Sequence, residues 1–233
     1  MKKEISNTEK EFIEKQYELQ KRICTEDTVE IQAIKTVAGV DLAYWKEEDI
    51  EYAACCVVVL DFATKSVIEK IDVVDQVDVP YIPGCLAFRE VPLFLRAYEK
   101  MENDPDVLLF DGNGYLHPRH MGLAMHAGIL IDKPTIGVAK SYYKVNDVDF
   151  VMPGYEENSY SNIEIDGEVY GRVLRTHSGI NPIFVSKGNR MGLDKATEIV
   201  KRLVTKESRI PLPTRYADIM THEVRKKYQC FGA

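Results

Sequence analysis

The sequence has few of the features that mark secreted, zinc-binding or membrane-spanning proteins. Its five cysteines are odd in number and form no CxxC pair, which argues against a disulfide framework and against a zinc site built on thiolates. No apolar stretch reaches the roughly 18 residues that a membrane span needs. The charged segment MKKEISNTEKEFIEKQ lacks the apolar core of a signal peptide. We therefore expect a cytoplasmic protein that does not enter a membrane.

The sequence also lacks an excess of positive charge. Its formal net charge is −7, whereas a protein that binds nucleic acid by simple electrostatic attraction usually has a surplus of lysine and arginine. The balance does not exclude an enzyme that acts on nucleic acid. Acidic residues that hold a metal ion lower the formal charge but do not repel phosphate once the cation is bound.

The order of the apolar runs predicts an α/β protein. Apolar residues at helical spacing predict an amphipathic helix over residues 4–24 that packs one face on the rest of the protein. Three strand-like runs with short polar links predict an antiparallel meander. Strands and helices then alternate, which indicates a β-α-β unit with parallel strands. The expected strands are 28–45, 52–62, 66–77, 107–111, 134–141, 164–176 and 181–189, and the expected helices are 91–101 (with Pro92 in its first turn), 120–130, 193–204 and 217–229.

An antiparallel meander joined to parallel strands, in a mixed sheet flanked by helices, is the organisation of the ribonuclease-H-like nucleases. This is a likeness of fold and does not by itself establish function. No internal repeat or break in composition divides the chain. We expect residues 1–233 to form a single domain, with residues 153–161 as an exposed loop.

Two apolar runs each end in an aspartate: Asp41 follows Val37–Val40, and Asp111 follows Val107–Phe110. Four apolar residues in a row are typical of a buried strand, and open α/β sheets gather ligands just beyond their strand ends. Glu90, at the start of a predicted helix, supplies a third acid. Three carboxylates suit one or two Mg²⁺ ions. Each acid also has an ordinary explanation, as a strand-end residue bonded to backbone, an Asx turn, or a helix-capping glutamate.

Lys140 follows the last apolar strand of the predicted parallel part. A lysine at this place can neutralise the charge that develops on a phosphate or help to activate an attacking water. The alternative is an ordinary exposed lysine at a strand end. Together with the three acids, Lys140 suits phosphodiester hydrolysis by metal-activated water.

The segment PYIPG contains two prolines and ends in Gly84, so Tyr81, Ile82 and Pro83 are expected on a rigid projection. A rigid tip beside a metal site can enter a stack of bases and separate paired strands. The alternative is a surface loop whose tyrosine packs on the body of the protein.

Four further residues are candidates for substrate contacts. Gly112 and Gly122 can line a pocket for a planar group, or can serve turns and helix packing. His117 and Arg119 follow Asp111 closely and can meet a phosphate, or can be plain polar surface.

Read in order, six segments of the chain resemble the endonuclease V family over about residues 15–225. The segments are AGVDLAYW, PYIPGCLAFRE, DGNGYLHPRHMGLAMH, IGVAKS, NPIFVSKGNR and IPLPTRYADIMTHE. The resemblance implies a ribonuclease-H-like fold and a DNA repair endonuclease that uses Mg²⁺, for which Mn²⁺ can substitute. We expect the protein to act as a monomer. Family members incise the second phosphodiester bond on the 3′ side of deoxyinosine in DNA and leave 3′-hydroxyl and 5′-phosphate ends. Some members act on inosine in RNA.

The resemblance also implies roles for matching residues. Asp41, Glu90 and Asp111 become metal ligands and catalytic acids, Lys140 becomes the catalytic lysine, and Asp218 in TRYAD becomes a further metal ligand. Tyr81 and its neighbours Ile82, Pro83 and Gly84 become the strand-separating wedge. Gly112 and Gly122 belong to the pocket for the flipped hypoxanthine.

Two alternatives stay open beside this reading. One is a ribonuclease-H-like nuclease with another target, such as RNA or branched DNA. The other is a nucleic-acid-binding module without catalysis, against which competent residues at all four catalytic positions argue. The chain departs from the family at Asn189, where histidine is common, and at Tyr142 and Tyr143, which can alter the pocket or favour single strands by stacking.

Overall fold

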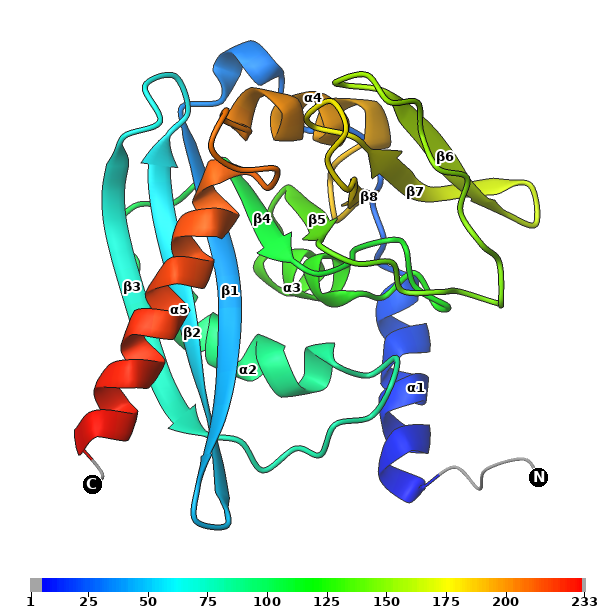
Figure 1. Ribbon diagram of the computed structural model, residues 1–233. Helices are drawn as coiled ribbons and strands as arrows, with labels where there is room; N and C mark the ends of the chain where they lie inside the picture. The colour runs from blue at the N-terminus through cyan, green and yellow to red at the C-terminus, as the bar shows by residue number, and fades with distance from the viewer. Residues whose placement is uncertain (1–5, 232–233) are drawn as a thin grey trace.

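Eight strands form one mixed sheet in the computed structural model, which describes residues 6–231 (Figure 1). In their order across the sheet they are β3 (Val67–Gln76), β2 (Ile50–Asp61), β1 (Thr36–Glu47), β4 (Val107–Asp111), β5 (Thr135–Ala139), β8 (Ile183–Lys187), β7 (Glu168–Leu174) and β6 (Tyr160–Ile165). The first three strands of the chain pair antiparallel, and β1, β4 and β5 pair parallel. Both parts of the predicted sheet are therefore confirmed, and β8, β7 and β6 extend it by antiparallel pairing.

Helices cover both faces of this sheet (Figure 1). They are α1 (Asn7–Gln20), α2 (Ala87–Glu99), α3 (Leu123–Ile131), α4 (Leu193–Leu203) and α5 (Leu212–Phe231), with a 3-10 turn at Ile31–Ala33. The helices α4 and α5 pack on one face of the sheet, and α2 and α3 pack on the other. Within residues 6–231 no helix is both long and apolar enough to cross a membrane.

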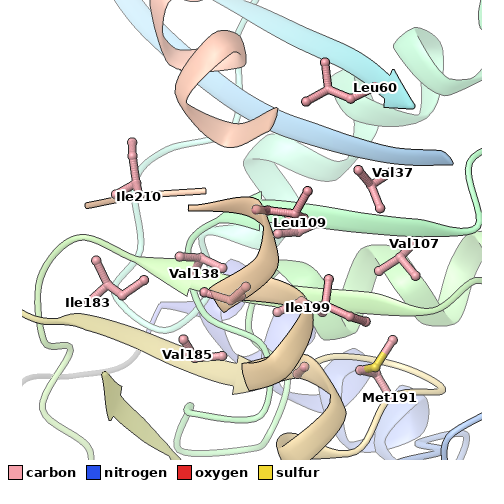
Figure 2. Close-up of a cluster of buried hydrophobic side chains, with 14 of the residues drawn as sticks. Val37, Leu60, Val107, Leu109, Val138, Ile183, Val185, Met191, Ile199 and Ile210 are labelled. Carbon is pink, nitrogen blue, oxygen red and sulfur yellow. The ribbon is translucent and has the colours of Figure 1, made fainter. Parts of the chain in front are cut away.

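The inner strands β1, β2, β4 and β5 are buried on both sides, which explains their apolar runs. Val37 and Leu109 face α4 and α5, while their neighbours Ala38 and Leu108 face α2 and α3. Sheets covered on both faces read as continuous hydrophobic stretches rather than alternating ones. Figure 2 shows the cluster on the α4 side, which contains Leu109 of β4 and Ile199 of α4. Burying one such side chain stabilises the fold by about 1.5–3 kcal/mol.

The N-terminal helix α1 is shorter than the predicted 4–24. Ser6 begins it by accepting a hydrogen bond from the Glu9 N–H (3.1 Å), and Lys21 ends it; residues 4 and 5 lie outside the described part of the chain. Phe12 stacks on Phe88 of α2 with ring centroids 4.2 Å apart. This contact packs α1 against the layer of helices formed by α2 and α3.

The segment 164–176 was predicted as one strand and is instead the hairpin of β6 and β7. Asp166 and Gly167 between them have φ values of 52° and 81°, the left-handed pair that a two-residue hairpin turn requires. The Asp-Gly pair was the signal that a strand prediction overlooked. The hairpin also takes the last residues of the predicted loop 153–161 into β6.

Other boundaries moved by a few residues. β1 begins at Thr36 rather than 28, α3 at Leu123 rather than 120, and α5 at Leu212 rather than 217. Because α2 begins at Ala87, Pro92 lies inside it and not in its first turn. Proline removes one helical hydrogen bond, but the buried apolar side chains on either side of Pro92 hold the helix on the sheet.

Gly39 lets α5 lie directly against β1. A Cβ atom at Gly39 would come within 2.0 Å of the Pro213 carbonyl carbon and 2.4 Å of the Thr214 nitrogen. These are backbone atoms of the first turn of α5, so a side chain cannot be accommodated by a rotamer change. The absence of a side chain at this one position sets the height of α5 above the strand.

We expect Gly39→Ala to lower the free energy of unfolding by about 1–3 kcal/mol or more, as overpacking does. For a chain of this length that corresponds to a fall in Tm of roughly 2–4 °C per kcal/mol. Gly154→Ala is the matched control, because a Cβ there meets Ser159 at an ordinary 3.6 Å. Thermal unfolding of both variants checks the prediction, and equal melting temperatures would contradict it.

Candidate active site

Parallel pairing brings Asp41 and Asp111 to the same level of the sheet. Val40 of β1 pairs with Phe110 of β4, so the next residue on each strand is an aspartate. Asp111 ends β4 as predicted, but Asp41 lies within β1, which continues to Glu47. Asp41 thus lies inside the predicted strand 28–45, and it is the apolar run and not the strand that ends there. At Asp41 only the pairing with β4 stops, while the ladder to β2 continues.

The helix α5 adds Asp218 to this pair. One oxygen from each of Asp41, Asp111 and Asp218 lies within 4.8 Å of the other two. The ammonium of Lys140 contacts two of these carboxylates, at 2.6 Å from Asp111 and 2.7 Å from Asp218. One helical turn beyond Asp218, the Thr221 hydroxyl donates to Asp41 Oδ2 (3.1 Å). We call Asp41, Asp111 and Asp218 the acidic cluster.

Glu90 reaches the region from α2, on the opposite face of the sheet. It lies in the first turn of that helix, as predicted, and its side chain is buried. The Tyr44 hydroxyl donates to Glu90 Oε1 (3.1 Å). Glu90 is not one of the three acids that share the 4.8 Å cluster, although the charges of Asp41 and Asp111 still act on it.

Two carboxyl groups are strongly perturbed. Burial, followed by the negative charge of Asp111, raises the pKa of Asp41 to about 7. Burial also raises the pKa of Glu90 to about 8, and the charges of Asp41 and Asp111 add to this against the lowering effect of the Tyr44 hydrogen bond. Burial lowers the pKa of Lys140, but its bonds to Asp111 and Asp218 outweigh burial and raise it overall. The protein thus holds repelling acids together around one ammonium.

A small cavity of about 110 Å³ is built from the segments that also carry the acids. Gly112 directly follows Asp111, and the wedge segment precedes Glu90. Five of the predicted substrate-binding residues line this cavity, namely Tyr81, Gly84, Gly112, His117 and Gly122, and Tyr143 lines it as well. A larger hollow of about 520 Å³ near Lys206 is lined by none of the predicted site residues.

Gly122 has a packing role in addition to its place on the cavity wall. A Cβ there would lie 2.4 Å from the Asn113 carbonyl oxygen. The close approach of these two backbones shapes the cavity, so the pocket and packing explanations for Gly122 apply together.

The wedge segment ends in an anchored turn. Gly84 has a left-handed φ of 76°, and its carbonyl accepts hydrogen bonds from Gln16 (3.0 Å), His117 (3.0 Å) and Arg119 (2.8 Å). Tyr81, three residues earlier, is 66% exposed. The tyrosine therefore does not pack on the body, which was the alternative explanation for PYIPG. Ile82, Pro83 and Arg119 do not line the cavity.

His117 is a neutral donor in this arrangement. The backbone N–H groups of Arg119 and Met121 donate to its Nδ1 at 3.1 and 3.3 Å, so Nε2 carries the proton that Gly84 accepts. Burial, followed by the charge of Arg119, lowers the pKa of His117 to about 3. Contact of His117 and Arg119 with substrate stays a prediction, since in the protein alone both hold the wedge segment.

The two departures from the family pattern have different surroundings. Asn189 is buried, and its side chain donates to the Gly128 carbonyl (3.0 Å). Tyr142 donates to the Val148 carbonyl (2.7 Å) and packs against Phe184. Tyr143, by contrast, lines the cavity.

Sequence reasoning missed Thr221, Tyr44 and Gln16, each of which holds a site residue by a hydrogen bond. Thr221 had a usable signal, since it follows Asp218 by three residues and so lies on the same face of a helix. Gln16 had none, because its bond to Gly84 spans 68 residues.

The strand order, with an acidic cluster beside the central strands of a mixed sheet flanked by helices, defines a protein of the ribonuclease-H-like class. Comparison with known proteins is more specific. The family model described as Endonuclease V matches residues 17–219, and the endonuclease V of Bacillus thuringiensis is 53% identical over 217 residues, covering 93% of this chain and 92% of that protein. The chain belongs to the endonuclease V family.

Solved structures agree with this assignment. The crystal structure of endonuclease V from Bacillus subtilis matches with a TM-score of 0.92 at 49% identity, covering 98% of this chain and 94% of that one. Endonuclease V from Ciona intestinalis, crystallised with a 24mer DNA that contains an inosine followed by a ribo-adenosine, matches with a TM-score of 0.85 at 29% identity, covering 96% of this chain and all of that one. The ribonuclease-H-like fold predicted for this chain is thereby confirmed.

Proposed function

We propose that this protein is a DNA repair endonuclease that recognises deoxyinosine and hydrolyses the second phosphodiester bond on its 3′ side. The products would be 3′-hydroxyl and 5′-phosphate ends, and the acting unit a monomeric, single-domain cytoplasmic protein. The observation that carries the proposal is that the acidic cluster and the cavity adjoin each other: Asp111 belongs to the cluster, and the next residue, Gly112, lines the cavity. The inosine-containing DNA bound by the Ciona relative supports the same substrate.

The donor set fits Mg²⁺, with Mn²⁺ as a substitute. Asp41, Asp111 and Asp218 offer only carboxylate oxygens, the ligands that hard divalent cations prefer. The raised pKa of Asp41 also supports a cation, because part of that rise comes from repulsion by Asp111. When bound, the ion would lower the pKa of a water molecule and stabilise charge on the phosphate. The acidic cluster would hold it, with Glu90 as the fourth acid.

The chain's own residues would then position the reacting groups. Thr221 fixes one oxygen of Asp41, and Tyr44 fixes one oxygen of Glu90, so the free oxygens keep a defined direction, as outer partners of metal ligands do. Lys140 would supply positive charge where negative charge develops on the phosphate. It is placed for this role by its contacts with Asp111 and Asp218.

The wedge and the cavity would select the substrate. Tyr81 on its anchored turn would fill the gap left by a base that leaves the helix, and the cavity would receive that base. Flipping a base costs a few kcal/mol, and least for a mismatched one, so deoxyinosine opposite thymine should be an easier substrate than a normal pair. The damaged base would stay attached to its sugar, unlike in a glycosylase.

Inosine in RNA is a second candidate substrate. The strand bound by the Ciona relative carries a ribonucleotide next to its inosine, which favours testing RNA beside DNA. Branched DNA is the remaining alternative target.

The test uses end-labelled oligonucleotides that differ only in one deoxyinosine or adenine, as single strands and as duplexes, with Mg²⁺ or with EDTA. We expect a single cut at the second phosphodiester 3′ to deoxyinosine, only with Mg²⁺, and a 3′ end that a polymerase extends. Matched inosine RNA and a branched DNA without inosine identify the alternatives. Equal cutting with and without inosine would overturn the proposal.

A further inference from the structure

Tyr143 lines the cavity, and no catalytic role accounts for an aromatic residue at this place. It follows Lys140 by three residues, lines the cavity together with Tyr81 and Gly84, and is 36% exposed. Its hydroxyl lies 3.7 Å from the position of a Cβ at Gly84, so the ring lies over the anchored end of the wedge segment. Within residues 6–231, no side-chain hydrogen bond holds this hydroxyl, so the polar group does not explain the position of the ring.

The Tyr143 ring lies nearly parallel to the ring of a neutral neighbour, His117. Its plane is within 11° of the plane of the His117 imidazole, with ring centroids 6.3 Å apart. His117 is itself fixed through Nδ1 and Nε2. Tyr143 thus lies beside an imidazole that is held at both of its nitrogen atoms.

Tyr142 provides a contrast within the same segment. Its hydroxyl donates to Val148, and its ring packs edge-on against Phe150 at 5.0 Å and on Phe184 at 5.4 Å. It belongs to the buried cluster beside β7 and β8. Of the two adjacent tyrosines, one therefore builds the core and the other is left facing the cavity.

We propose that Tyr143 stacks on the nucleobase that enters the cavity and is a binding residue for that base. The inference rests on the proposed function and adds to it the side chain on which the base stacks. A π-face accepts every base, and stacking on an aromatic side chain is worth about five- to 150-fold in binding per base. Tyr143 would accordingly supply affinity for the extruded base, while the polar edge of the base is read elsewhere in the cavity.

The test measures equilibrium binding of Tyr143→Leu in EDTA, so that no strand is cut, to three single strands that differ at one position. That position carries deoxyinosine, adenine or an abasic residue. We expect about five- to 150-fold weaker binding of the deoxyinosine strand and unchanged binding of the abasic strand, which has no base to stack. Tyr143→Phe keeps the ring and is expected to bind all three strands as the wild type does.

Tyr155→Leu is the matched control, since Tyr155 is 71% exposed and does not line the cavity. Equal loss of binding to base-bearing and abasic strands in Tyr143→Leu, or no loss at all, would overturn the inference. If Tyr143→Leu unfolds, Tyr143→Phe decides, because weak binding by that variant would show that the hydroxyl and not the ring matters. Equal binding of the deoxyinosine and adenine strands by the wild type would contradict the proposed function. The stacking inference would still be tested, because it depends on the comparison of base-bearing with abasic strands.

Discussion

Replacing Asp41 by asparagine is expected to slow cleavage of inosine-containing DNA severely while making the metal-free protein more stable. Asparagine removes one charged oxygen donor from the acidic cluster, and metal ions supply several kcal/mol of transition-state stabilisation. At about 1.4 kcal/mol for each tenfold change, the rate should fall by roughly a thousandfold or more. Asparagine can still accept the Thr221 hydrogen bond, so the local packing is retained.

The gain in stability follows from the sign of the pKa shift. The pKa of Asp41 is 3.8 in the reference state and about 7 in the folded protein. Between these values the folded state binds more protons than the unfolded state, so the free energy of unfolding falls as pH rises from about 4 to about 7. Above about pH 7 the free energy of unfolding has lost this whole contribution and no longer changes with pH on account of Asp41. Asp41→Asn lacks this loss and should melt at least roughly 2–4 °C higher at pH 8 in EDTA.

Thermal unfolding between pH 4 and pH 8.5 in EDTA, with cleavage measured in Mg²⁺, checks both parts of this prediction. Mg²⁺ at about a hundredfold above its Kd should stabilise the wild type by about 2.7 kcal/mol and should affect Asp41→Asn much less. Asp72→Asn is the control, because Asp72 lies exposed on β3. A wild-type cleavage rate in Asp41→Asn would show that Asp41 is not part of the active site. If stability still depended on pH as it does in the wild type, Asp41 would not be the cause of that dependence.

Replacing Lys140 by glutamine should slow cleavage by about a hundred- to a thousandfold, the usual effect of losing one preorganised electrostatic contact. Burial lowers the pKa of Lys140, but bonds to Asp111 and Asp218 raise it overall. The ammonium therefore stays charged from pH 6 to pH 9, and it acts as a fixed positive charge rather than as a base. Removing it leaves the acids it contacts without their counter-charge.

Single-turnover rates and binding of an uncleaved inosine strand separate the two roles of Lys140. The rate should fall in Lys140→Gln while binding changes only a few-fold, and the pH profile of the wild type should show no ionisation of a lysine below pH 9. Lys144→Gln is the control, since Lys144 pairs at the surface with Asp149 (2.7 Å). A full rate in Lys140→Gln, or losses of rate and binding that are equal, would be inconsistent with this role.

Much of the fold was predictable because its signals are local. The parallel strands are buried on both faces, so Val107–Phe110 appears in the sequence as an unbroken apolar run. Helix starts were less predictable. Ala87 begins α2 before Pro92 because buried apolar contacts outweigh one missing hydrogen bond, and such contacts cannot be read from a proline alone.

The sequence by itself determined which residues could do the chemistry: the aspartates after apolar runs, the lysine after a strand, and the stiff segment around Tyr81. Only the tertiary structure decided which of them meet. Thr221 bonds to Asp41 across 180 residues, and Asp218 joins the acidic cluster because α5 crosses β1 at Gly39, where no side chain keeps it away. Contacts of this kind depend on how two distant surfaces pack, and no local pattern encodes that. The same holds for Tyr143, which faces the cavity only because Tyr142 is taken up by the core.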